Sequence, residues 1–405
     1  NKKASKFEDD GFNQQDINFK IGINLAQHSR IQTTIKRLSA DNEYDGTTNP
    51  NADFNNTLDI ETKQLQYLYN HDFINAKLFL QTQETKAAYL SNFGLYESEG
   101  LIEHFGAQLG YQYSENNQAN ITVEKKHAKD AIAKRNYTNT GIAMTNTHKI
   151  NKSLVLNEVL RFDNYSDFKN ATTGRIGIKN SFSDNIFLAA NYATGYNVPS
   201  LFQLSANNPK QLEAESVKSH EVTLGAYGAQ ITYFKSQTDN LLESAGSWPN
   251  TYYLNSAGKT KKQGWELNYK QSINAIDTDF VFNASWITAK DSNDQLKAYI
   301  PQNQASLTFD NYSFAKLHWG ASIHYTGENY PAADQQGKQI GNYFLTDFFA
   351  DYQLNKQVNA YLKVKNLQDQ EYISSVADFP AVNPQPNFVY DSGGRQFFLG
   401  LRVKL

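Results

Sequence analysis

Apolar and polar residues alternate along most of this chain with a period of two. The alternation is clearest over 316–325 and 397–405, where every second residue is apolar and the others are polar or glycine. Segments 16–26, 104–113 and 358–364 repeat it. Because successive side chains of a β-strand point to opposite faces, this period predicts strands with one apolar and one polar face.

Short turns and longer loops separate these segments in alternation. Counting along the chain predicts about 19 strands, with short turns at one end and long loops at the other, as in outer-membrane barrels. The predicted turns are 27–30, 70–72, 114–118, 151–153, 183–185, 274–277 and 311–313, and the predicted long loops are 41–57, 196–216, 239–251 and 374–393.

The composition excludes several classes of protein. Aromatic residues make up 13% of the 405 residues, which argues against disorder. No segment approaches the ~20 apolar residues that a membrane-spanning helix needs. The absence of cysteine excludes disulfides, thiol catalysis and cysteine-ligated metals. A net charge of −3 argues against nucleic acid as a partner. Without a recognisable Ser, His and acid set, we do not expect an enzyme.

Two fold classes fit alternating strands. A soluble sandwich or propeller would bury the apolar faces in a core and expose the polar faces to water. A transmembrane β-barrel reverses this arrangement, since apolar side chains face lipid and polar side chains line the lumen. The mixture of glycine and charge on the polar faces, with no blade-like repeat, favours the antiparallel transmembrane barrel. In its last strand we expect Phe397, Leu399, Leu401 and Val403 to face lipid, and Arg402 and Lys404 to face the lumen.

Four blocks of the second half resemble TonB-dependent outer-membrane receptors. Their spacing and order match that family together, although the terminal Leu405 stands where the family usually ends in an aromatic residue. The blocks are Tyr192, Tyr196, Pro199, Leu201 and Phe202, continuing through Asn208, Pro209, Leu212, Glu213, Glu215 and Glu221; Asn255, Gly258, Gly264 and Glu266; Val364, Asn366, Leu367, Asp369 and Tyr372; and Gly394 with Arg395.

The resemblance also implies a domain organisation. Receptors of this family have about 22 strands around a separate N-terminal plug. With about 19 strands predicted here, residues 1–405 are expected to be the C-terminal part of such a barrel, and the plug and about the first three strands are missing. The family further implies the bacterial outer membrane, membrane lipid as surroundings, and TonB as a partner through the missing N-terminal part.

Within the family, the likeness is strongest to the cobalamin receptors. It implies uptake of cobalamin or a related corrinoid, and a calcium site formed by Glu8, Asp9, Asp10, Tyr44 and Asp45. Calcium takes six to eight oxygen ligands, so carboxylates from two neighbouring loops suit it. The alternative is a solvated acidic loop. For the function, the alternatives are a siderophore receptor and a passive, plugless porin.

External aromatic residues are the candidate ligand contacts. Rings at the barrel mouth could stack on a large flat ligand, but they could equally form the interfacial girdle of a membrane barrel. These candidates are Tyr89, Phe93, Tyr96, Trp248, Tyr252 and Tyr253.

Overall fold

A computed structural model describes residues 11–45, 53–91, 94–206, 211–246, 251–377, 388–391 and 394–404. Within these ranges the chain forms one 19-stranded antiparallel sheet and two small two-stranded sheets. The elements are β1 (Phe12–Ala26), β2 (Ser29–Asp45), β3 (Asp53–His71), β4 (Ile74–Ser91), β5 (Gly94–Ser114), β6 (Asn117–Asp130), β7 (Arg135–Lys149), β8 (Leu154–Tyr165), β9 (Ala171–Ser183), β10 (Ile186–Asn197), α1 (Leu201–Ala206), β11 (Glu215–Ala226), β12 (Ala229–Asp239), β13 (Leu242–Ala245), β14 (Tyr252–Asn255), β15 (Lys259–Ile273), η1 (Asn274–Ile276), β16 (Thr278–Lys290), β17 (Asn303–Phe314), β18 (Leu317–Thr326), η2 (Ala333–Gln335), β19 (Tyr343–Gln353), β20 (Val358–Lys365), β21 (Ile373–Ala377), β22 (Phe388–Asp391) and β23 (Gln396–Val403).

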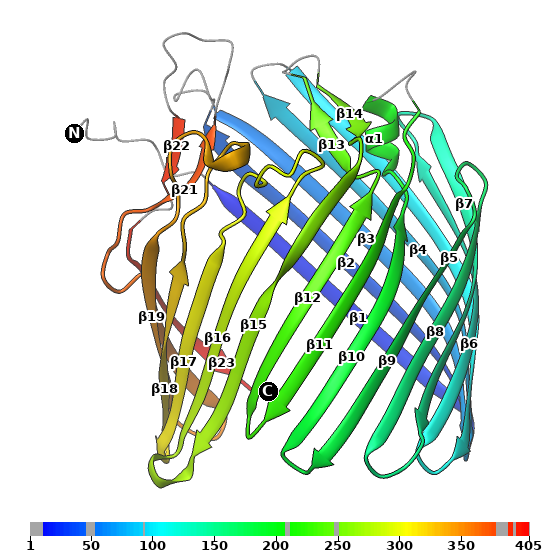
Figure 1. The fold of residues 1–405 in the computed structure, drawn as a ribbon, viewed down its shortest axis with the longest axis horizontal. Coiled ribbons are helices and arrows are strands. Elements are labelled where there is room, and N and C mark those ends of the chain that lie inside the picture. Colours follow the sequence, from blue (N-terminus) through cyan, green and yellow to red (C-terminus); the bar gives the residue numbers. More distant parts are fainter. Residues whose placement is uncertain are drawn as a thin grey trace.

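Strands of the large sheet pair in chain order. The two exceptions are β12 with β15 and β20 with β23, where the hairpins β13–β14 and β21–β22 are inserted between partners. Figure 1 shows the sheet curled into a barrel, with short turns at one end and the longer connections at the other. The predicted all-β fold, the antiparallel pairing and the strand count are confirmed.

The register places apolar side chains of neighbouring strands side by side. Leu65 of β3 lies opposite Leu80 of β4, which in turn lies opposite Phe105 of β5. At the other end of the sheet, Leu399 of β23 lies opposite Leu362 of β20 and is 82% exposed. A continuous face of exposed apolar side chains is the surface that a transmembrane barrel presents to lipid.

One contact across the mouth shows that the polar face is the inner one. Tyr96 shares the polar face of β5 with His104, since the two are separated by an even number of residues. Its ring lies 6.0 Å from the ring of Phe202, between centroids. Phe202 belongs to α1, which follows β10, several strands away along the sheet. Only the concave side of a curled sheet allows this contact, so the polar side chains face the lumen.

The last strand has the predicted polarity. Leu401 lies opposite Ala360 on the apolar face, whereas Arg402 lies opposite Asn359 on the polar face. The Arg402 guanidinium is 3.2 Å from the Asp351 carboxylate of β19, so the cation is paired on the lumen side.

Several predicted connections are wrong in extent. Predicted loop 41–57 is largely strand, because β2 continues to Asp45 and β3 begins at Asp53. Predicted loops 239–251 and 374–393 contain the hairpins β13–β14 and β21–β22. The predicted turn 311–313 instead follows Phe314, because Asn311 still pairs with Trp319 and its amide donates to the Ile276 carbonyl. Polar runs usually mark turns, but here paired strands tolerate them.

The described part of the chain contains no helix long and apolar enough to cross a membrane. Within the same part, β1 pairs only with β2 and β23 pairs only with β20, so the large sheet has two edges.

Candidate functional site at the barrel mouth

A hydrogen-bonded cluster joins the external connections around β11 and β14. The Asn255 side chain accepts a hydrogen bond from the Glu213 N–H (2.8 Å) and donates to the carbonyls of Glu213 (2.9 Å) and Asn240 (2.8 Å). Asn240 donates to the Glu213 carboxylate at 3.0 Å. Glu215 accepts from the Leu242 N–H at 2.7 Å. The family-like residues Glu213, Glu215 and Asn255 therefore hold the external segments in position.

Helix α1 is anchored beside this cluster. Pro199, just before it, is almost completely buried. The Ser200 hydroxyl accepts from the Gln203 N–H, and the Gln203 side chain accepts from the Ser200 N–H, which is a reciprocal capping box. Figure 1 shows α1 at the external end of the barrel, beside β13 and β14. This local sequence fixes a short helix that presents Phe202 to the mouth.

Aromatic rings from six elements, the adjacent strands β2 to β5 together with α1 and β14, form a line across the mouth. Tyr44 of β2 packs against Phe54 of β3, with centroids 5.9 Å apart, and stacks on Tyr89 of β4 at 5.4 Å. Tyr89 lies directly opposite Tyr96 of β5 in the register. Phe202 then contacts both Tyr96 at 6.0 Å and Tyr253 of β14 at 6.1 Å. We call these six residues, Phe54, Tyr44, Tyr89, Tyr96, Phe202 and Tyr253, the aromatic line.

The rings of the aromatic line are only half-covered. Tyr89, Tyr96 and Phe202 are 45%, 50% and 47% exposed. Rings that touch at 5–6 Å and still expose half their surface can each add contact area to a bound molecule. The arrangement is suited to a large ligand with an extended apolar or aromatic face.

Tyr44 is the most constrained member of the aromatic line. Its hydroxyl donates to the Leu90 carbonyl. Burial raises the pKa of Tyr44 far above its usual range, and interaction with Tyr89 raises that pKa further. Burial also raises the pKa of Tyr96, with Asp130 and Tyr253 adding to the shift. These phenols are neutral hydrogen-bonding groups under physiological conditions.

The structure brings together several predicted site residues. Tyr89, Tyr96 and Tyr253 lie in the aromatic line, at strand ends and not in loops as predicted. Tyr252 precedes Tyr253 in β14, so its side chain points to the opposite face of that hairpin. Phe93 and Trp248 lie outside the described residues.

The predicted calcium ligands fall mainly outside the described ranges. Glu8, Asp9 and Asp10 precede residue 11, and Asp45 is the last residue of β2, with a side chain that is not described. Tyr44, the fifth predicted ligand, is part of the aromatic line. Among the described residues, no three His, Asp or Glu side chains are close enough together to hold a metal ion.

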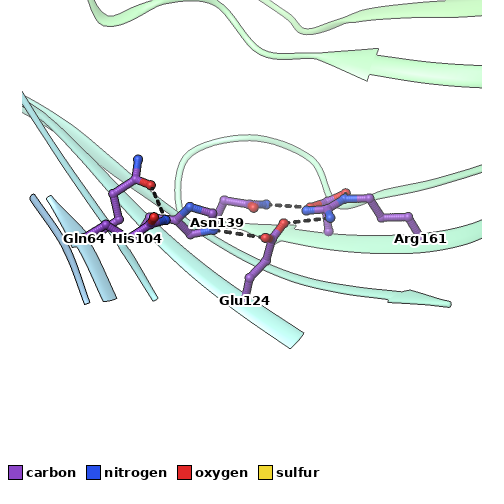
Figure 2. Close-up of polar contacts among 7 residues, drawn as sticks. Gln64, His104, Glu124, Asn139 and Arg161 are labelled. Carbon is purple, nitrogen blue, oxygen red and sulfur yellow. Dashed lines mark hydrogen bonds and ion pairs between the residues drawn. The ribbon is translucent and has the colours of Figure 1, made fainter. Parts of the chain in front are cut away.

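Further down the lumen wall, a charged network links β5, β6 and β8. The Arg161 guanidinium lies 2.7 Å from the Glu124 carboxylate and 2.6 Å from that of Asp163. Glu124 also contacts the His104 ring nitrogen at 3.0 Å. Asp163, which is 6% exposed, accepts from the Asn139 amide at 3.0 Å. Figure 2 shows His104, Glu124 and Arg161 in succession along the wall.

A glycine makes this network possible. Gly141 of β7 lies opposite Glu124 on one side and opposite Asp163 on the other. A Cβ atom at this position would lie 2.3 Å from Nη2 of Arg161. The arginine therefore crosses β7 over a residue without a side chain and reaches carboxylates on both neighbours.

Sequence reasoning missed Phe54 and Phe202 as site residues and missed the charged network. Phe202 was noted only as part of a family-like block. Glu124 and Arg161 lie on the polar faces of non-adjacent strands, so no short spacing in the sequence joins them. Counting the register from each turn would have aligned Glu124, Gly141 and Asp163.

Comparison with known families supports these observations. The sequence model of the family described as "TonB dependent receptor-like, beta-barrel" matches residues 3–367. The chain belongs to this family. Its members are transport receptors of the bacterial outer membrane and not enzymes, so the predicted family, location and absence of enzyme activity are confirmed.

Curated relatives of this receptor barrel include proteins named vitamin B12 transporter BtuB. The one from Vibrio vulnificus is 25% identical over 235 residues, covering 56% of this chain and 37% of the relative. One from Vibrio cholerae is 21% identical over 230 residues, covering 54% of this chain and 36% of the relative. The matched part thus spans little more than a third of each relative.

Solved structures share the fold of the receptor barrel. The ferric enterobactin receptor PfeA of Pseudomonas aeruginosa has a TM-score of 0.85 at 15% identity, covering 98% of this chain and 70% of that one. The siderophore receptor PirA of Acinetobacter baumannii has a TM-score of 0.80 at 13% identity, covering 97% and 71%. At such low identity the similarity establishes the fold alone.

Proposed function

We propose that this barrel belongs to an outer-membrane transporter for cobalamin or a related corrinoid, energised through TonB. The aromatic line carries the proposal, because it offers several half-exposed rings at the external mouth to a large ligand with a flat macrocycle. The names of the relatives from Vibrio support the same ligand class.

Phe202 connects this binding surface to the external connections. Its ring joins Tyr96 on one wall to Tyr253 on the hairpin β13–β14, which Asn255 attaches to the segment before β11. A ligand that contacts Phe202 would therefore act, through that ring, on segments held by the family-like residues. Binding would order the mouth as one unit and commit the ligand to uptake.

The test is a titration of the full-length parent protein with cyanocobalamin and, separately, with a ferric catecholate chelate. We expect tight binding of cyanocobalamin and weak binding of the chelate. Micromolar or weaker binding of cyanocobalamin together with tight binding of the chelate would replace the proposal by a siderophore receptor. Binding of neither ligand, with unspecific passage of small solutes through liposomes, would favour a passive porin.

We also propose that calcium supports ligand binding. Glu8, Asp10 and Asp45 would supply carboxylates, and Asp9 and Tyr44 would complete the ligand set. The acidic sequence and the position of Tyr44 within the aromatic line support this proposal. Calcium that orders these segments should tighten the ligand, and the ligand should tighten calcium by the same factor. Unchanged ligand affinity in the double variant Asp10→Asn/Asp45→Asn, or in a chelator, would contradict it.

A further inference from the structure

Two histidine rings meet at the end of the barrel opposite the mouth. His28 lies in the two-residue turn between β1 and β2, and His71 is the last residue of β3. Their ring centroids are 4.3 Å apart, with an interplanar angle of 82°. The Asn70 N–H donates to the His28 carbonyl at 2.9 Å, so the backbone also joins these two turns.

The ring of His71 is held in a defined orientation. It stacks on Tyr69 of the same strand, with centroids 6.4 Å apart and an interplanar angle of 17°. Its Nδ1 atom lies 3.3 Å from the Asp72 carboxylate. A carboxylate beside one ring nitrogen favours the tautomer with the proton on that nitrogen, so Nε2 of His71 keeps its lone pair. Histidines that ligate metal ions usually have a carboxylate or carbonyl in this position.

His28 supplies a second ring beside His71. Among the described residues, neither ring nitrogen of His28 has a hydrogen-bond or ion-pair partner, and its ring contact is with His71. Two imidazoles that share one metal ion, each at ~2.0–2.1 Å from a nitrogen, have centroids about 4.5–5 Å apart. The observed separation is close to this value, so small rotations of the two rings would aim one nitrogen of each at a shared ion.

This pair of rings is open to water. The side chains of His71 and Asp72 are 44% and 68% exposed. A polar cavity of about 280 Å³ adjoins them and is also lined by Asn75, Gln112 and Gln118. Water can therefore occupy the coordination positions that two imidazoles leave open. Two protein ligands completed by water also agree with the absence of a three-residue metal cluster from the part of the chain that the structure describes.

We propose that His28 and His71 bind one divalent transition-metal ion, with Asp72 as the positioning residue behind His71. Imidazole nitrogens suit Cu²⁺, Ni²⁺ and Zn²⁺, whereas Mg²⁺ and Ca²⁺ require oxygen ligands. The bound ion would cross-link the β1–β2 and β3–β4 turns. Because Phe54 of the aromatic line lies near the other end of β3, this site is separate from the proposed ligand surface.

The test is titration of the full-length parent protein in detergent, without a histidine tag, with Cu²⁺ as the probe. Isothermal titration calorimetry measures the affinity, and electron paramagnetic resonance of Cu²⁺ counts the coordinating nitrogens. We expect two ring nitrogens in the parent. His28→Gln and His71→Gln should each leave one nitrogen and weaken binding about tenfold or more. Zn²⁺ should compete with Cu²⁺, and Ca²⁺ should not.

Two further variants separate the roles of these residues. Asn adopts a positive φ as readily as Asp, so Asp72→Asn keeps the turn, where φ is 43°, but removes the negative charge. Its affinity for Cu²⁺ should fall roughly tenfold with two nitrogens still bound. His148→Gln is the matched control, because His148 lies at the same end of β7 and packs against Tyr113 instead of a second histidine. It should leave the affinity unchanged.

Three results would overturn the proposal. One is coordination of Cu²⁺ by no more than one ring nitrogen in the parent. Another is unchanged affinity in His28→Gln and His71→Gln, both shown to be folded by heat-modifiable electrophoretic mobility. The last is an equal loss of affinity in His148→Gln, which would mean that Cu²⁺ binds to exposed histidines in general. If a glutamine variant does not fold, Asp72→Asn decides, since an unchanged affinity in that variant contradicts the proposed role of the carboxylate.

Discussion

Arg161 is the one cation that contacts two carboxylates of the lumen wall at once, within the described residues. Replacing it with methionine keeps much of the side-chain volume but removes the cation shared by Glu124 and Asp163, which keep only their contacts with His104 and Asn139 among the described residues. We expect Arg161→Met to lower the free energy of unfolding by about 1–3 kcal/mol, since these groups are only partly exposed to water.

The measurement is equilibrium unfolding of the full-length protein in urea with a membrane mimetic. Arg175→Met is the matched control, because among the described residues the Arg175 guanidinium contacts the Asn191 amide oxygen and no carboxylate. Its effect should stay within about 0.5 kcal/mol. Equal effects of both substitutions would mean that the ion pairs of Arg161 with Glu124 and Asp163 add nothing to the free energy of unfolding.

Phe202 should matter to ligand binding far more than its exposed position suggests. Phe202→Ala removes the ring that joins Tyr96 to Tyr253, so the aromatic line is interrupted at its centre. Loss of one ring contact with the ligand at about 0.5–1.5 kcal/mol predicts cyanocobalamin binding weakened roughly 2- to 12-fold in a titration. Phe182→Ala, an equally simple truncation at an exposed residue of β9, should leave affinity unchanged.

The tyrosine pair gives a prediction about pH. The folded-state pKa of Tyr44 is raised above its unfolded value of 10.0 by burial first and by Tyr89 second. The native state therefore holds this proton where the unfolded state loses it, so the stabilisation is complete below about pH 10 and is lost as pH rises above that value.

Ultraviolet titration of tyrosinate in the folded protein checks this expectation. Tyr89→Phe should lower the Tyr44 pKa toward 10.0 without reaching it, because burial remains. A Tyr44 that titrates at 10.0 in the parent would show that the phenol is solvated.

At the scale of elements, the connection between β13–β14 and the segment before β11 depends on one side chain. Asn255→Ala removes an acceptor for the Glu213 N–H and a donor to the carbonyls of Glu213 and Asn240. We expect amide protons of 211–215 and 252–255 to exchange with deuterium at least tenfold faster, a change of about 1.4 kcal/mol in local opening. Asn255→Asp keeps the acceptor and should give an intermediate rate.

Strands were the part of the fold that the sequence could predict. Alternation over 397–405 gave the extent of β23 and the face of Arg402 because lipid on one side and lumen on the other impose opposite polarities. Connections were predicted less well. β2 and β3 both extend into the predicted loop 41–57, where polar residues such as Asn42 and Asn56 pair in register. Polarity therefore did not distinguish strand from loop in this segment.

The candidate site could be predicted only in part. Tyr89, Tyr96 and Tyr253 were predicted as external aromatic residues, and Tyr253 lies just after the predicted loop 239–251. The contribution of Phe202 could not be predicted, because it depends on where α1 crosses the mouth, and no local pattern encodes a contact between elements that do not pair.

At the scale of the whole molecule, the two sheet edges carry a prediction. Unpaired backbone groups of β1 and β23 would be exposed to lipid, where each costs several kcal/mol. We therefore propose that further strands close the barrel between them. Residues 1–405 expressed alone should fail to show heat-modifiable mobility after refolding in detergent, whereas the full-length parent should show it. Equal mobility shifts would mean that β1 and β23 close on each other.

The aromatic line also constrains the order of assembly. Strands pair with their chain neighbours, so the sheet can grow by local steps that close short loops. The contacts of Phe202 with Tyr96 and Tyr253 join regions far apart in the chain, and they can form only after the strands between them have paired. Completion of the mouth is thus a late event in biogenesis. A ligand that recognises all three rings would bind mature barrels and ignore partly inserted ones, and so would serve as a reporter of finished folding.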